Sequence, residues 1–164
     1  MPRKAKKRKK KEPADQTYII EVVDWEFDYL FGINNFKSDV ISGDYLDCTT
    51  LILLGKIISP TLKNIRQVGI RISENPGLDD HWHKEIVVRP AIGWIEILRG
   101  NDVLEMNCEV PSRSFKSISI AVASKKVRFA TIVGTELKWR KGKIFQVILS
   151  TTHPDAAKYS HDIE

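Results

Sequence analysis

The densest group of potential metal ligands in the sequence is the run DDHWHKE, residues 79 to 85. If this run is a strand, alternate side chains project to one face, so His81 and His83 lie on the same side. Histidine pairs of this kind bind zinc and other divalent metals. The pattern therefore makes His81 and His83 candidate ligands of a metal cofactor.

The segment from Gly77 to Gly93 loosely resembles the first metal motif of the cupins, jelly-roll proteins with glycine, His-x-His, glutamate and glycine at set intervals. The resemblance implies a metal-dependent jelly-roll enzyme centred on His81 and His83. The spacing departs from the cupin pattern, because residues i and i+4 of a strand lie roughly 13 Å apart and His81 and Glu85 cannot share one ion. We therefore favour a solvated loop or strand end, with no metal and no other cofactor.

Other catalytic patterns are missing from the sequence. It contains no Gly-x-Ser-x-Gly elbow, no phosphate-binding glycine loop and no Cys-x-x-Cys. The carboxylates of Glu21, Asp24, Glu26 and Asp28 are spaced like the solvated face of a strand. We therefore expect a protein without catalytic residues that is not an enzyme.

Basic residues surround an aromatic side chain near the C-terminus, in the run KWRKGK from residue 138. A hairpin tip is expected at Lys141-Gly142. Nucleic-acid binders with β surfaces hold phosphates with cations and stack bases on aromatic rings. The candidate polyanion ligands here are Lys138, Trp139, Arg140, Lys141 and Lys143. The alternative is that the ring of Trp139 packs into the core while the cations only solubilise the tip.

A second cluster of the same kind contains Lys125, Lys126, Arg128 and Phe129, next to a hairpin tip expected at Ser124-Lys125. Strand alternation places Phe129 on one face with Val127, Thr131 and Val133. That pattern favours a buried ring at Phe129.

The first twelve residues, MPRKAKKRKKKE, carry eight basic side chains and one acid. Such a run has almost no apolar surface to bury and its charges repel one another, so we expect a disordered arm over residues 1–14. Clustered cations attract phosphate backbones by counterion release. The candidate polyanion ligands of the arm are Lys4, Lys6, Lys7, Arg8, Lys9, Lys10 and Lys11.

The formal net charge of +5 conceals this uneven distribution. Residues 13–112 carry eight basic and sixteen acidic side chains, whereas residues 113–145 carry nine basic side chains and one acid. The arm alone contributes more positive charge than the whole chain retains. Any binding to a polyanion must therefore depend on the arm or the basic third, not on the overall charge.

The sequence lacks the features of a secreted or membrane-spanning chain. The longest aliphatic run, Leu51 to Leu54, is far too short to span a membrane, and no apolar signal segment follows the basic start. Cys48 and Cys108 lie on the apolar sides of alternating segments, which predicts buried free thiols rather than a disulfide. We expect a cytoplasmic protein, or a nuclear one if the host is eukaryotic.

Alternation with a period of two dominates residues 15–150 and predicts strands. The expected strands are 17–23, 25–31, 45–54, 65–72, 84–88, 91–98, 103–110, 115–123, 127–137 and 143–149. Turn signals at Ser59-Pro60, Asn75-Pro76-Gly77 and Gly100-Asn101 separate several of them. Apolar residues on both faces of 91–98 predict a central strand covered on both sides, or a strand under a loop.

These patterns predict an all-β fold: a single antiparallel β-sandwich domain over residues 15–150, resembling a jelly roll, with a flattened β-barrel as the alternative. Residues 151–164 are expected to be a polar tail. The favoured function is a non-enzymatic binding module whose arm contacts a polyanion, most simply nucleic acid. The alternatives are a protein-interaction or self-assembling domain, and a metal-dependent enzyme.

Overall fold

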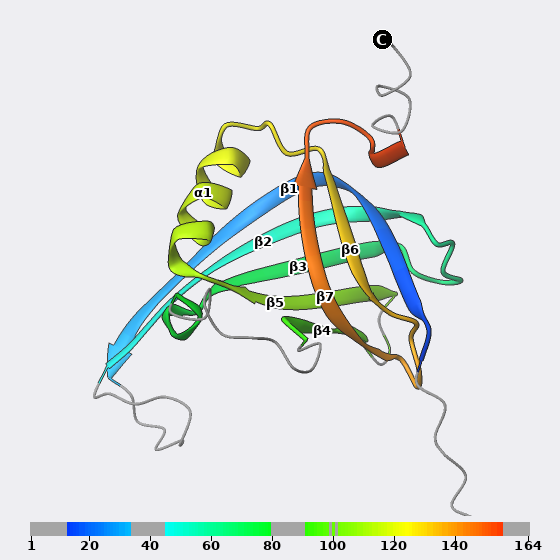
Figure 1. Cartoon of the computed structure of the whole chain (residues 1–164), viewed down its shortest axis with the longest axis horizontal. Coiled ribbons are helices and arrows are strands. Elements are labelled where there is room, and N and C mark those ends of the chain that lie inside the picture. Colours follow the sequence, from blue (N-terminus) through cyan, green and yellow to red (C-terminus); the bar gives the residue numbers. More distant parts are fainter. Residues whose placement is uncertain (1–12, 34–44, 80–90, 99, 101, 156–164) are drawn as a thin grey trace, which may run out of the picture.

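The computed structural model describes residues 13–33, 45–79, 91–98, 100 and 102–155. Seven strands in these ranges form one closed barrel in the order β1, β2, β3, β5, β4, β7, β6 (Figure 1). The strands are β1 (Asp15–Ile33), β2 (Tyr45–Ser59), β3 (Gln67–Glu74), β4 (Gly93–Ile97), β5 (Val103–Val110), β6 (Phe129–Thr135) and β7 (Lys141–Ser150). A 3-10 turn, η1 (Pro76–Leu78), follows β3, and one helix, α1 (Ser112–Ala123), lies between β5 and β6.

The all-β class is confirmed, and the barrel is the alternative architecture rather than the favoured sandwich. Closure results from the pairing of β6 with the first part of β1, where Asp15 to Glu21 lie opposite Thr135 to Phe129. The pairing is also not wholly antiparallel, because β3 and β5 run parallel to each other. Alternation within a strand reveals its two faces but not its neighbours, so the sequence favoured two sheets where the chain makes one.

Helix α1 corrects the prediction of a strand over residues 115–123. Phe115 and Val122 are buried and Ile118 packs against the core, a spacing that puts all three on one side of a helix. The same stretch alternates in polarity over short distances, which is why it resembled a strand. The expected hairpin tip at Ser124-Lys125 is instead the end of this helix. Lys125 has a φ of 56°, and the amides of Lys125 and Lys126 donate to the carbonyl oxygens of Val122 and Ala121.

The core of the barrel is built from inward-facing aliphatic side chains of all seven strands. The largest are Tyr18, Ile20, Leu51, Leu53, Ile70, Ile72, Ile95, Leu104, Met106, Ile132 and Ile144. The inward side chain of β4 is Ile95, whereas Trp94 faces outward and is exposed, so the prediction of a strand covered on both faces is wrong. The expected strand 84–88 lies outside the described residues.

Both cysteines are free. Cys108 is buried on β5, and its thiol donates to the carbonyl oxygen of Arg71 at 3.6 Å. Cys48 is half-buried on β2, with its sulfur 3.8 Å from the hydroxyl of Thr50. Within the described residues, no helix is long and apolar enough to cross a membrane.

The first residues of the expected C-terminal tail lie against the barrel. The ring of His153 meets that of Phe129 edge-on at 5.2 Å, and its Nδ1 lies 3.7 Å from a carboxylate oxygen of Asp155. Phe129 is buried, as its alternation predicted. Residues 156–164 lie outside the described residues.

Candidate polyanion-binding end of the barrel

Among the residues that the structure describes, the turn between β6 and β7 carries the most exposed aromatic side chain. Lys138 and Lys141 exchange backbone hydrogen bonds at 2.8 and 3.1 Å, so Trp139 and Arg140 form a two-residue loop. Their φ values of 55° and 69° are both positive, as a type I′ turn requires. The hairpin is confirmed, but its tip lies two residues before the expected Lys141-Gly142. Asn-Gly would have signalled a type I′ turn, whereas Trp-Arg gives no such signal.

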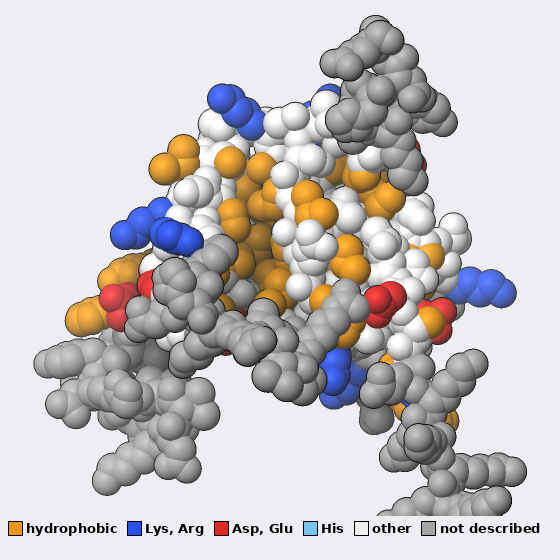
Figure 2. All heavy atoms as spheres, viewed as in Figure 1, with side chains coloured by type: hydrophobic (Ala, Val, Ile, Leu, Met, Phe, Trp, Pro, Cys, Tyr) orange, Lys and Arg blue, Asp and Glu red, His pale blue; other side chains and the backbone are white. Residues whose placement is uncertain are grey.

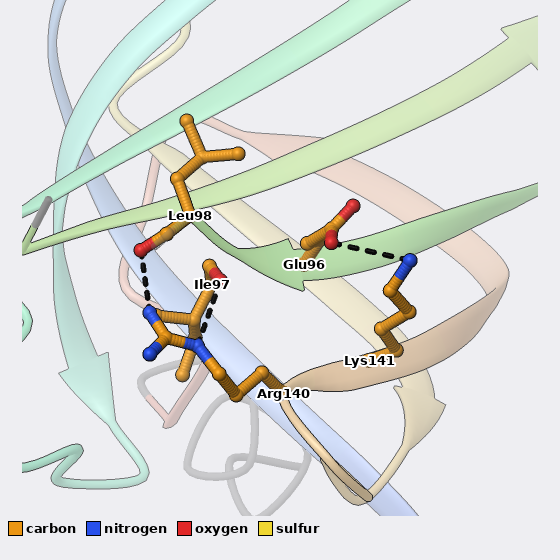
Figure 3. Close-up of polar contacts among 5 residues, drawn as sticks. All are labelled: Glu96, Ile97, Leu98, Arg140 and Lys141. Atoms are coloured by element: carbon orange, nitrogen blue, oxygen red, sulfur yellow. Dashed lines mark hydrogen bonds and ion pairs between the residues drawn. The ribbon is translucent and has the colours of Figure 1, made fainter. Parts of the chain in front are cut away.

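Arg140 anchors this turn to the end of β4 (Figure 3). Its Nε donates to the carbonyl oxygen of Ile97 at 3.0 Å, and a terminal nitrogen donates to the carbonyl oxygen of Leu98. In return, the amide of Ile97 donates to the carbonyl oxygen of Arg140 at 2.9 Å. Lys141 lies beside it and pairs with Glu96 at 3.2 Å. Arg140 and Lys141, two of the predicted polyanion ligands, therefore hold the turn in place. Their positive charges are already partly compensated by backbone carbonyl oxygens and by Glu96.

The remaining members of the predicted cluster face solvent. Trp139 is 89% exposed, so its ring is not a core residue, and Lys138 and Lys143 are exposed as well. A tryptophan held outward on a turn fixed by Arg140 presents a flat apolar surface to a ligand. Lys138 and Lys143 supply cations on either side of it along the chain.

The start of β1 brings the basic arm to this same end. The carbonyl oxygen of Ala14 accepts from the amide of Glu136 at 2.8 Å, and Asp15 lies opposite Thr135. The arm residues from Lys4 to Lys11 lie outside the described residues. Because the arm joins the barrel at Pro13, its point of attachment is a few residues from Trp139. The structure therefore places the attachment point of the arm at the end of the barrel that carries the second basic segment, more than a hundred residues further along the sequence.

The loop before β3 adds two cations, Lys63 and Arg66, that no motif in the sequence indicated. A groove of about 360 Å³ is lined by Lys63, Asn64, Ile65, Ile97, Gly100, Asp102 and Arg140. Lys63 lies on its wall, and Arg66 next to it pairs with Asp102 at 3.6 Å. Neither cation stands next to an aromatic residue in sequence, so no motif identified them. We call this region, made of residues 13–15, 60–66, 96–98, 100, 102 and 135–143, the arm end.

The second basic cluster is not part of the arm end. Lys125, Lys126 and Arg128 precede β6, whereas Thr135 at the other end of β6 lies at the arm end. Seven residues of strand separate the two by roughly 20 Å. The guanidinium of Arg128 lies 5.9 Å from the centre of the Phe129 ring. The structure therefore divides the basic third into two separate clusters.

The predicted metal ligands cannot be placed, because His81 and His83 lie outside the described residues. Among the residues that are described, no group of three or more histidine, cysteine, aspartate or glutamate side chains could hold a metal ion. Comparisons of the chain with protein-family models, with curated proteins and with solved structures found no match.

Proposed function

We propose that the protein is a non-enzymatic binding module whose basic arm, together with the arm end of the barrel, binds a polyanion, and that this polyanion is nucleic acid. The observation that carries the proposal is the hydrogen bond between Ala14 and Glu136, which attaches the arm beside the exposed ring of Trp139. Cations and a stacking surface are thereby available to one strand of nucleic acid.

The charges support a local site rather than general attraction. Outside the arm, acidic side chains outnumber basic ones by two, so the barrel as a whole repels a polyanion weakly. The arm and the exposed Lys138 and Lys143 provide concentrated positive charge at one end. Counterion release from the bound phosphates then supplies the affinity, and its strength falls with salt.

The backbone of the turn also supports a binding role. Trp139 and Arg140 both adopt positive φ, which costs a non-glycine residue roughly 1 kcal/mol or more each. The hydrogen bonds of Arg140 to Ile97 and Leu98 offset part of this cost. The strained geometry keeps the indole in solvent, where it can stack on a base. Stacking on an aromatic ring tolerates every base, which suits a single strand of any sequence.

Metal-dependent chemistry at His81 and His83 stays a prediction, because the structure does not describe those residues. The protein-interaction alternative depends on a different surface, at the other end of β1, residues 23–33.

The test is binding of a fluorescent single-stranded oligonucleotide, measured by anisotropy over a range of salt concentrations. We expect the affinity of the full chain to fall steeply with salt, and removal of residues 2–11 to abolish most of the slope. Trp139→Ala should weaken binding about tenfold without changing the slope, because it removes stacking and no charge. Lys138→Gln with Lys143→Gln should lower the slope by about one to two units.

Lys116→Gln with Lys126→Gln is the matched control, since both lysines are exposed and lie away from the arm end. It should leave affinity and slope nearly unchanged. Binding that survives removal of residues 2–11 would contradict the role of the arm. An equal loss in the control would show that the arm end is not the binding site.

A further inference from the structure

Strands β1 and β2 extend beyond the barrel as a two-stranded ribbon, residues 23–33 and 45–49. Strand β6 pairs with β1 only up to Glu21, and β3 pairs with β2 only from Thr50 onward. Within the described part of the chain, no third strand pairs with residues 29–33 and 45–49, whereas residues 24–28 of β1 lie opposite residues 50–54 of β2, which also pair with β3. A two-stranded ribbon is marginally stable in water unless something packs on its apolar face.

One face of the ribbon is aromatic and continues the inner wall of the barrel. A bulge between Val22 and Asp24 shifts the alternation, so that Trp25 lies opposite Leu53 and Phe27 opposite Leu51, both core residues. The side chains that follow on this face are Tyr29 and Phe31. Along the ribbon the exposed fractions are 36%, 51%, 62% and 60% for Trp25, Phe27, Tyr29 and Phe31. Figure 2 shows hydrophobic and acidic side chains gathered over this part of the molecule.

The acidic side chains of the ribbon lie almost entirely on its other face. Asp24, Glu26 and Asp28 lie opposite Leu54, Ile52 and Thr50 and therefore point away from the aromatic residues. Pairing two copies along their β1 edges would bring these carboxylates side by side, which destabilises a sheet. Packing two copies through their aromatic faces keeps the carboxylates apart. Charge therefore favours contact through the face and not along the edge.

The aromatic face carries an acidic residue at the free end of the ribbon, its tip, and basic residues at the end next to the barrel, its base. At the tip, Asp47 lies opposite Phe31 and shares its face. At the base, a groove of about 380 Å³ is lined by Trp25, by valines of β1, α1 and the segment before β6, and by Lys125 and Arg128, with Asp24 as its acid. An aromatic ring with a neighbouring carboxylate matches a groove with valine walls and two cations.

We propose that a second copy of this chain covers the aromatic face, and that the two ribbons pack face to face and antiparallel about a two-fold axis. The tip of each ribbon, Phe31 with Asp47, then enters the groove of the other copy, next to Lys125 and Arg128. Such an interface requires a surface that is complementary to itself. The seven residues from Trp25 to Phe31 span roughly 20 Å, so both tips reach both grooves at the same time.

The area involved is sufficient for the core of a dimer interface. Four half-exposed aromatic side chains offer roughly 400 Å² per copy, given the 150–250 Å² that each such side chain can bury. A standard interface takes about 800 Å² from each partner, with an apolar centre and a polar rim. The ribbon backbone and the walls of the groove provide the remainder. This inference goes beyond the proposed function and uses a different part of the molecule.

The experiment is the mass of the full chain in solution by light scattering and sedimentation over a micromolar concentration range. We expect twice the chain mass of 18.8 kDa. Tyr29→Ser with Phe31→Ser should raise the dissociation constant at least about tenfold. The control, Trp94→Ser with Ile148→Ser, replaces two exposed apolar residues elsewhere on the barrel and should leave the dimer intact. Circular dichroism melting verifies that each variant is folded.

A charge exchange tests the arrangement of the two ribbons. Asp47→Arg alone and Arg128→Asp alone should each weaken the dimer, because each places like charges together in both contacts. The two changes combined in one chain should restore it. A wild-type monomer, a dimer insensitive to the serine variant, or a combined variant no tighter than the single ones would each overturn the proposal.

Discussion

Tyr18 shows what one buried hydroxyl contributes to the closure of the barrel. Its side chain is fully buried, and the hydroxyl donates to the carbonyl oxygen of Thr135 at 2.8 Å. Burial, together with the negative charge of Glu136, raises the pKa of Tyr18 to about 12. Burial and then the charge of Glu109 raise the pKa of the Cys108 thiol to about 12 as well. Both groups are therefore held in their neutral forms.

The raised pKa of Tyr18 predicts a loss of stability in alkali. The unfolded chain releases the Tyr18 proton near pH 10 and the folded chain near pH 12, so the stabilisation is complete below pH 10 and is lost between these values. The loss is about 3 kcal/mol at most. Urea unfolding between pH 8 and 12 measures it, with Tyr18→Phe as comparison. The variant should be about 1–2 kcal/mol less stable at pH 8 and lose less on going to pH 12. Parallel curves would contradict the assignment.

At the scale of elements, β4 is the short strand on which closure depends. It has five residues, and it pairs with β5 on one side and β7 on the other. Gly93 begins the strand so close to the backbone of Asn107 and Cys108 that a methyl group there would overlap the carbonyl oxygen of Asn107. Gly69 on β3 has no heavy atom within 4 Å of the same position. A side chain at position 93 would therefore clash with the neighbouring backbone, whereas a side chain at position 69 would meet open space.

We predict that Gly93→Ala lowers the free energy of unfolding by at least about 2 kcal/mol, because backbone rather than a flexible side chain must move. Gly69→Ala should change it by less than about 1 kcal/mol and in the stabilising direction, since alanine restricts the unfolded chain. Denaturant unfolding of the two variants side by side decides the matter. Equal effects at both positions would contradict the close packing of β4.

At the scale of the whole molecule, β1 links two ends with different properties. Its first residues pair with β6 at the arm end, and its last eleven form the ribbon with β2. The arm end is basic, with one exposed tryptophan, whereas the ribbon combines aromatic and acidic side chains. A polyanion is attracted by the first and repelled by the carboxylates of the second.

The two proposals are therefore separable in experiment. Removal of residues 2–11 should abolish most oligonucleotide binding and leave the mass in solution at twice 18.8 kDa. Tyr29→Ser with Phe31→Ser should produce a monomer whose binding to a short oligonucleotide has the salt dependence of the full chain. A single variant that abolishes both properties while remaining folded would show that the two ends act together.

The sequence by itself determined the all-β class and the positions of the basic clusters along the chain. Strand β5 has the predicted bounds, residues 103–110, whereas β2 begins at Tyr45 as predicted but continues five residues past Leu54 to Ser59, where the following proline ends it. These features are local, since alternation and turn chemistry operate over a few neighbouring residues. The prediction of a strand over residues 115–123 was wrong because the short-range alternation there fits both a strand and one side of a helix.

Only the tertiary structure decided which strands are neighbours, and the two candidate surfaces depend on that. Pairing of β1 with β6 closes the barrel and places the attachment point of the arm at the end that carries Trp139. The bulge near Val23 directs the aromatic side chains of β1 to the inner face, where Tyr29 and Phe31 remain more than half exposed. Both results follow from hydrogen bonds between residues distant in sequence, and alternation along one strand contains no information about its partner.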